Sequence, residues 1–236
     1  MFVPLSDDNP LRSIPFQYVT ILLIAANVAV FFFAQSVAGV QATGLALVPV
    51  ELRTEGIFGP VVPGETFDGF NLPERITLIT YMFMHADILH LAGNMLFLWV
   101  FGDNIEDAMG HARFLVFYLL CGVAAAMAHV IMTPDAPASG FPLVGASGAV
   151  AGCVGAYLVL HPKVRIWILV LRFIPFQVSA AWALGAWAVM QVMALVPQST
   201  PVAWWAHVGG LVAGAILIVI MRRPGVPLFD RTSYST

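Results

Sequence analysis

Long apolar runs without a charged residue alternate along the chain with shorter segments that carry most of the charges. Each run approaches the roughly 20 residues that a helix needs to cross a bilayer. The runs predict one domain of six membrane spans, at about 18–38, 86–105, 113–133, 143–161, 176–196 and 202–221. A long connection over residues 41–84 is expected to form an outer loop, and the short apolar run 166–171 is expected at the membrane interface.

The composition supports the same class of protein. Of the 236 residues, 60% are hydrophobic and 10% are charged, against roughly 25% charged in an average soluble domain. The charge is too sparse for a water-facing surface or for a basic nucleic-acid-binding patch. We therefore expect an all-α polytopic protein whose partner is the lipid bilayer. Cys121 and Cys153 lie in apolar runs and are interpreted as small apolar residues.

The positive charges predict the orientation of the spans. Of the 10 Lys and Arg residues, only Arg53 and Arg75 fall in the connections predicted on one side of the membrane. All the others lie in the terminal segments and in the second and fourth connections. Cytoplasmic segments are enriched in Lys and Arg, so both termini are expected in the cytoplasm.

Polar side chains inside the predicted spans gather near the outer ends of three of them. His85, His90 and Asn94 belong to the second span, Ser147 to the fourth and His207 to the sixth. At 1.5 Å per residue, Ser147 is roughly 6 Å and His207 roughly 9 Å past the predicted start of its helix. A polar group in a span is costly, so these residues are candidates for function.

Small residues predict that the fourth and sixth spans pack closely. They form a stripe on each helix: Gly148 and Gly152, and Gly210 and Gly214. Such stripes let two backbones approach, which would bring Ser147 within hydrogen-bond reach of His207.

A serine facing a histidine is suited to acyl transfer. The imidazole accepts the hydroxyl proton while the serine oxygen attacks a carbonyl carbon. The helix N-terminus near Ser147 and the side-chain donors of His90 and Asn94 are expected to stabilise an oxyanion. No buried Asp or Glu is apparent in the spans to orient His207, so we predict a Ser147–His207 dyad that uses no metal or other cofactor. Activity is expected to fall on the acid side as His207 takes up a proton.

Four short motifs follow one another along the chain. They are His85-x4-His90-x3-Asn94, Gly102-x3-Glu106, Gly145-Ala146-Ser147-Gly148 and Ala206-His207-x2-Gly210-x3-Gly214. Together they resemble the rhomboid family of intramembrane serine proteases over about residues 80–219. Within the second motif, Glu106 lies near the inner face and is interpreted as a helix-end stabiliser.

The resemblance implies a six-helix core that cleaves single-span membrane protein substrates near the outer face. It implies Ser147 as nucleophile and His207 as general base and acid. Oxyanion and substrate contacts would come from His90, Asn94 and Gly145, with His85 in a supporting role.

The resemblance also bears on location and gating. The chain is similar to the minimal bacterial-type form, which implies a bacterial inner membrane. Residues 175–196 correspond to the segment thought to admit substrate, and the oligomeric state is left open.

Three other functions remain as alternatives. His85, His90 and His207 together could bind zinc, although no His-Glu-x-x-His motif is present. A transporter would need inverted repeats and a midplane carboxylate. A non-catalytic rhomboid-like scaffold would bind membrane clients without cleaving them.

Overall fold

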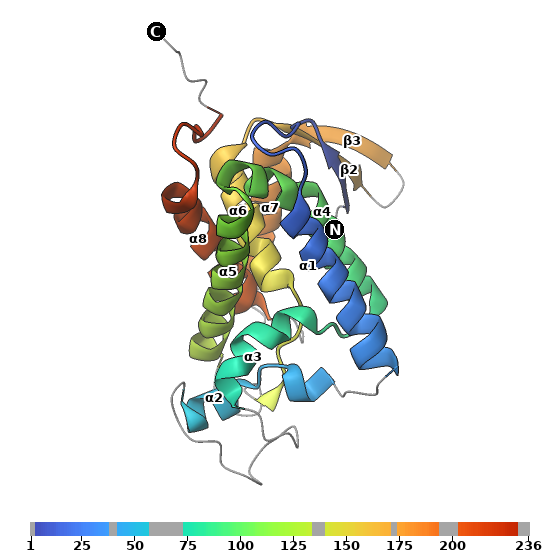
Figure 1. Cartoon of the computed structure of the whole chain (residues 1–236), viewed down its shortest axis with the longest axis vertical. Helices are drawn as coiled ribbons and strands as arrows, with labels where there is room; N and C mark the ends of the chain where they lie inside the picture. The colour runs from blue at the N-terminus through green and yellow to red at the C-terminus, as the bar shows by residue number, and fades with distance from the viewer. Residues whose placement is uncertain are drawn as a thin grey trace.

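The computed structural model describes residues 3–37, 42–56, 73–133, 140–170, 174–193 and 203–230. The longer helices run roughly side by side along the long axis of the molecule (Figure 1). They are α1 Tyr18–Ala29, α4 Ile88–Met109, α5 His111–Met132, α6 Ser147–Leu160, α7 Ala180–Met193 and α8 Trp204–Met221. A π-helical segment, Val30–Val37, continues α1. Short helices cover one end of the bundle: η2 Ala42–Leu45, α2 Pro49–Glu55, α3 Glu74–Thr80 and η3 Tyr81–Phe83.

The apolar helices agree with the predicted membrane class. Within the described residues, α4, α5 and α8 are long and apolar enough to cross a bilayer, whereas Tyr18–Phe33, α6 and α7 are shorter apolar helices. Large apolar side chains are exposed on the outer faces, among them Phe33, Ile131 and Ile220 at 72%, 69% and 73%. The polytopic helical fold is thus confirmed, while the number of crossings stays a prediction.

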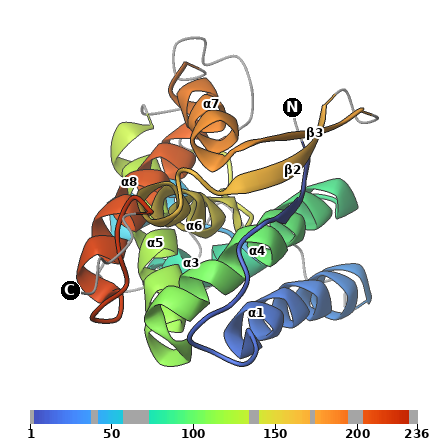
Figure 2. The ribbon, with the colours of Figure 1, turned by 90° about the horizontal axis from the view of Figure 1, so that it is seen from above.

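Helix α6 lies at the centre of the bundle. Seen from above, it is surrounded by α4, α5, α7 and α8, with α1 outside α4 (Figure 2). Every residue from Gly148 to Tyr157 is buried. This stretch consists mainly of Gly, Ala, Val and Cys, so the neighbouring helices can approach its backbone closely.

A small antiparallel sheet, which the apolar pattern did not predict, covers the other end of the bundle (Figure 1). Its strand order is β1 Val3–Asp7, β2 Arg165–Val170, β3 Ile174–Ser179. In β2 the side chains of Ile166 and Ile168 are buried while Trp167 is exposed, the period of two that a half-buried strand requires. Helix α7 consequently begins at Ala180, four residues after the predicted start of the fifth span.

Two carboxylates of α4 hold the N-terminal segment at the sheet end. Buried Glu106 accepts hydrogen bonds from Val19 N (2.9 Å), Thr20 N (2.8 Å) and Thr20 Oγ1 (2.7 Å). These amides belong to the first turn of α1, where a negative charge is favourable. Asp107 accepts from the backbone N–H groups of Arg12, Ser13 and Ile14. The interpretation of Glu106 as a helix-end stabiliser is confirmed.

Candidate active site

Ser147 is the first residue of α6, not a residue one turn inside it as the pattern suggested. Gly145 has φ +113°, a left-handed value that glycine adopts readily and that does not continue a right-handed helix. The first backbone hydrogen bond into α6 runs from Val150 N to Ala146 O (2.9 Å). The N–H groups of the first turn therefore have no acceptor within the helix and point out of its end, beside Ser147.

The segment before Ser147 is held from several sides. Gly145 N donates to Tyr81 O (2.9 Å), and Leu47 and Leu143 exchange backbone hydrogen bonds of 3.1 and 2.7 Å. Ala146 N donates to His85 Nε2 at 3.4 Å. The short helices at this end of the bundle thus fix the position of the serine.

The structure brings Ser147 and His207 together as predicted. Ser147 Oγ lies 2.9 Å from His207 Nε2. The contact depends on glycines at the α6–α8 interface, where a Cβ added at Gly210 would stand 1.9 Å from Gly148 O. A Cβ added at Gly214 would lie equally close, 1.9 Å, to Gly152 O. The predicted close packing of these two helices is confirmed.

A third side chain, which the sequence analysis missed, completes the arrangement around His207. Gln191 of α7 is buried, and its Oε1 lies 2.7 Å from His207 Nδ1. Its Nε2 lies 3.3 Å from Trp187 O, one turn earlier in the same helix. The predicted dyad followed from the lack of an Asp or Glu in the spans, which left amides out of account. In the predicted fifth span, 176–196, Gln177 and Ser179 lie near the start and Gln191 lies deep in the apolar run, and that depth was the available signal.

His90 and Asn94 lie on the other side of the serine, around Gly145. A Cβ at Gly145 would be 2.6 Å from His90 Cε1 and 3.6 Å from Asn94 Nδ2, so the glycine leaves the space that these side chains occupy. Asn94 Nδ2 is buried and has no hydrogen-bond partner within the described part of the chain. An unpaired buried donor is costly, and an incoming oxyanion would satisfy it.

His85 packs against His90 on this side of the site. Its ring packs edge-on against the ring of His90, with centroids 5.2 Å apart. Its backbone N–H and C=O are both bound by the side-chain amide of Gln35, at 3.0 and 2.9 Å. These contacts suit a residue that positions others.

Two indole rings flank the imidazole. The ring centroids of Trp187 and Trp204 lie 6.1 and 5.9 Å from that of His207, the second in edge-on geometry. Among the described residues, no three His, Cys, Asp or Glu side chains are placed to hold a metal ion. The contact between Ser147 and His207 is the arrangement that nucleophilic chemistry at a serine requires.

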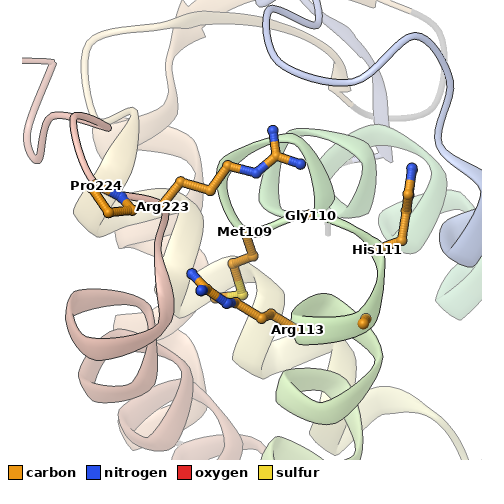
Figure 3. A pocket seen from close by; sticks show the side chains of 7 residues that line it. Met109, Gly110, His111, Arg113, Arg223 and Pro224 are labelled. Carbon is orange, nitrogen blue, oxygen red and sulfur yellow. The ribbon is translucent and has the colours of Figure 1, made fainter.

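An open cleft of about 680 Å³ lies far from this site, where α4 turns into α5. Arg113, Arg223, His111 and Pro224 line it, as Figure 3 shows. Helix α4, which carries His90 near its start and Met109 at its end, has 22 residues and is about 33 Å long. The cleft is thus separate from the serine and has no part in its chemistry.

The apolar helical bundle is that of a polytopic membrane protein. The serine and histidine in contact at one end form a candidate serine-hydrolase site. Residues 73–224 match the family model described as Rhomboid domain. The chain belongs to the rhomboid family.

Individual relatives agree with that assignment. The chain is 41% identical to Rhomboid protease GluP of Bacillus subtilis over 81 residues, which are 34% of this chain and 15% of that protein. It is 29% identical to Presenilin-associated rhomboid-like protein A, mitochondrial, of Danio rerio over 139 residues, which are 59% of this chain and 36% of that protein. It is 32% identical to Inactive rhomboid protein 1 of Drosophila melanogaster over 98 residues, which are 41% of this chain and 7% of that protein. The chain therefore spans between 7% and 36% of the length of these three relatives.

Proposed function

We propose that this chain is an intramembrane serine endopeptidase that cleaves membrane proteins within the bilayer. The observation that carries the proposal is the 2.9 Å contact between Ser147 Oγ and His207 Nε2 at the end of a buried helix. Family membership supports it, because the relatives include a protein named as a protease. A relative named as inactive makes non-catalytic binding of membrane clients the competing function.

The geometry supports a two-step mechanism. His207 Nε2 takes the proton of Ser147 Oγ as that oxygen bonds to the substrate carbonyl carbon. The resulting oxyanion accepts hydrogen bonds from the first-turn N–H groups of α6 and from Asn94 Nδ2, with His90 beside it. As the peptide C–N bond breaks, the imidazolium returns its proton to the leaving amine. Water then attacks the acyl-enzyme, with His207 again taking and returning a proton.

The placement in the membrane is part of the same proposal. Six crossings, with Tyr18–Phe33, α6 and α7 as the shorter ones, would put both termini on the side where Lys and Arg gather. Ser147 then lies near the outer face, where single-span substrates would be cut. We propose a bacterial inner membrane as the location, in line with the similarity to GluP.

The test is labelling by a fluorophosphonate, which reacts with an activated serine and needs no known substrate. Wild type, Ser147→Ala and His207→Ala are purified in mild detergent and compared by in-gel fluorescence between about pH 5 and 8. We expect labelling of the wild type alone, because Ser147 is an activated nucleophile only when His207 can take its proton. A folded wild type that does not label across this range would favour the scaffold function instead.

A further inference from the structure

Gln191 is a buried polar residue in a part of α7 whose other side chains are mostly exposed and apolar. The side chains next to it along the helix, Met190, Val192 and Met193, are exposed at 46%, 50% and 62%, as suits a lipid-facing surface. The buried residues of α7 are Ala180, Ala183, Leu184 and Gln191. Gln191 is therefore the only buried residue in the second half of the helix. A polar amide in that position needs partners, and it has two.

Those two partners determine which way the amide points. Trp187 O is a carbonyl and only accepts hydrogen bonds, so the NH₂ group of Gln191 must face it, at 3.3 Å. The amide oxygen then faces His207 Nδ1 at 2.7 Å. Because that oxygen only accepts, Nδ1 must carry the imidazole proton. Nε2 is left with its lone pair directed at Ser147 Oγ, which is the arrangement a general base requires.

We propose that Gln191 is a positioning residue that holds His207 in the Nδ1–H tautomer and so makes its Nε2 the base for Ser147. The inference rests on the proposed protease function for its consequence in catalysis, but the tautomer itself is a property of the resting protein. Without the amide, the imidazole can also place its proton on Nε2, and in that form it cannot accept the serine proton. The neutral amide thus takes the place that a carboxylate occupies in a catalytic triad.

The position of Gln191 also links the dyad to the packing of α7. Trp187, one turn earlier, packs against Phe97 of α4 in a tilted geometry and lies near His207, with both ring centroids 6.1 Å away. Gln191 and Trp187 both contact His207 from this half of the helix. If the second half of α7 moves away from α8, the Nδ1 hydrogen bond is lost, since it joins the two helices directly. The orientation of the imidazole therefore depends on α7 lying against α8.

The closest matched test replaces Gln191 with Met, which has a similar shape and fills irregular space in a core but offers no comparable acceptor. Met190→Leu, on the lipid-facing side of the same helix, is the control. We expect Gln191→Met to lower the rate of fluorophosphonate labelling about 10- to 100-fold, since the base is no longer held in one orientation. Met190→Leu should label at the wild-type rate.

Gln191→Glu is the rescue variant, because its carboxylate oxygen also accepts from Nδ1–H. It should restore labelling relative to Gln191→Met. A carboxylate further stabilises the imidazolium, so the acid-side loss of labelling should begin at higher pH than in wild type. A merely structural role for Gln191 would produce no such change in the pH profile.

The tautomer is measured directly by ¹⁵N NMR of histidine-labelled protein, with the His207 signals assigned by their absence in His207→Ala. The protonated and unprotonated ring nitrogens have well separated shifts. Wild type should show a single Nδ1–H form, and Gln191→Met a mixture or the Nε2–H form. Wild-type labelling with an Nε2–H spectrum, or an unchanged spectrum and rate in a folded Gln191→Met, would overturn the inference. A wild type that shows the Nδ1–H form but never labels would overturn the protease proposal and leave the tautomer assignment standing.

Discussion

The two ends of the helical bundle differ in how their buried polar side chains are hydrogen-bonded. At the sheet end, Glu106 accepts three hydrogen bonds from the start of α1 and one from His111, and Asp107 accepts three more. At the dyad end, Asn94 Nδ2 and His85 Nδ1 are buried without a partner among the described residues. Saturated networks stabilise a fold, whereas unpaired buried donors are costly and are kept where a ligand satisfies them. Asn9 Nδ2 is likewise buried without a partner at the sheet end, so the contrast is between the saturated carboxylates of α4 and the unpaired groups near Ser147.

The largest effect is expected from Gly210→Val, which acts on the α6–α8 contact between the two ends. Its Cβ would overlap Gly148 O, so the helices must separate, and both labelling and folding should be lost. Gly185→Ala in α7 is the control, because nothing lies within 4 Å of its added Cβ. It should raise stability by about 0.5–1 kcal/mol. Yield of folded protein and labelling are the measurements, and a folded, active Gly210→Val would contradict the packing described above.

Asn94→Leu tests the dyad end alone. It removes the unpaired donor, so the rate of fluorophosphonate labelling should fall about 10²- to 10³-fold, the usual loss for one oxyanion donor. Thermal stability should stay the same or rise, because a buried unsatisfied amide has been replaced by an apolar side chain. Stability is followed with a thiol-reactive dye that detects Cys121 and Cys153, both free and buried in the folded protein. A variant that loses stability but labels normally would show that Asn94 stabilises the fold and does not act as an oxyanion donor.

Glu106→Ala tests the sheet end and should show the opposite behaviour. The amides of Val19 and Thr20 lose their acceptor, at about 1–3 kcal/mol for each buried donor left unpaired. The melting temperature should drop in the same dye assay. Labelling per folded molecule should remain close to wild type, because Ser147 lies at the far end of the bundle. Loss of labelling at temperatures where the variant is folded would show that the two ends are not independent.

The smallest expected effect is a pH dependence of the sheet end. Burial raises the pKa of Asp7 from 3.8 to about 6, against the lowering effect of the hydrogen bond from Tyr157 Oη (2.5 Å). The folded state therefore keeps this proton where the unfolded chain has released it. The resulting stabilisation is complete below about pH 4 and is lost as the pH rises through about 6. Melting followed by circular dichroism should show wild type losing stability between these values and Asp7→Asn losing less. Equal losses of stability in both proteins would show that Asp7 does not cause the pH dependence.

The comparison of the two ends also shows where sequence reasoning reached its limit. Spacing within single helices was informative: the glycine stripes predicted the α6–α8 contact, and the polar residues of three spans pointed to one site. The start of α6 was predicted four residues early, because an apolar run does not reveal that Gly145 has a positive φ. The run 166–171 is apolar throughout and shows no alternation in sequence, and the partners of this strand are the separate segments Val3–Asp7 and Ile174–Ser179.

The sequence by itself determined the membrane class, the long apolar helices and the meeting of Ser147 with His207, because hydropathy and helical period are properties of neighbouring residues. The tertiary structure alone decided that Gln191 lies against His207 Nδ1, that Asn94 Nδ2 is left unpaired and that the first strand joins the β2–β3 hairpin. These features depend on how separate helices and strands dock, which brings together groups that no local pattern connects. A hydrogen bond between two such groups requires both to be placed within about 3 Å, and only the packed bundle fixes positions that closely.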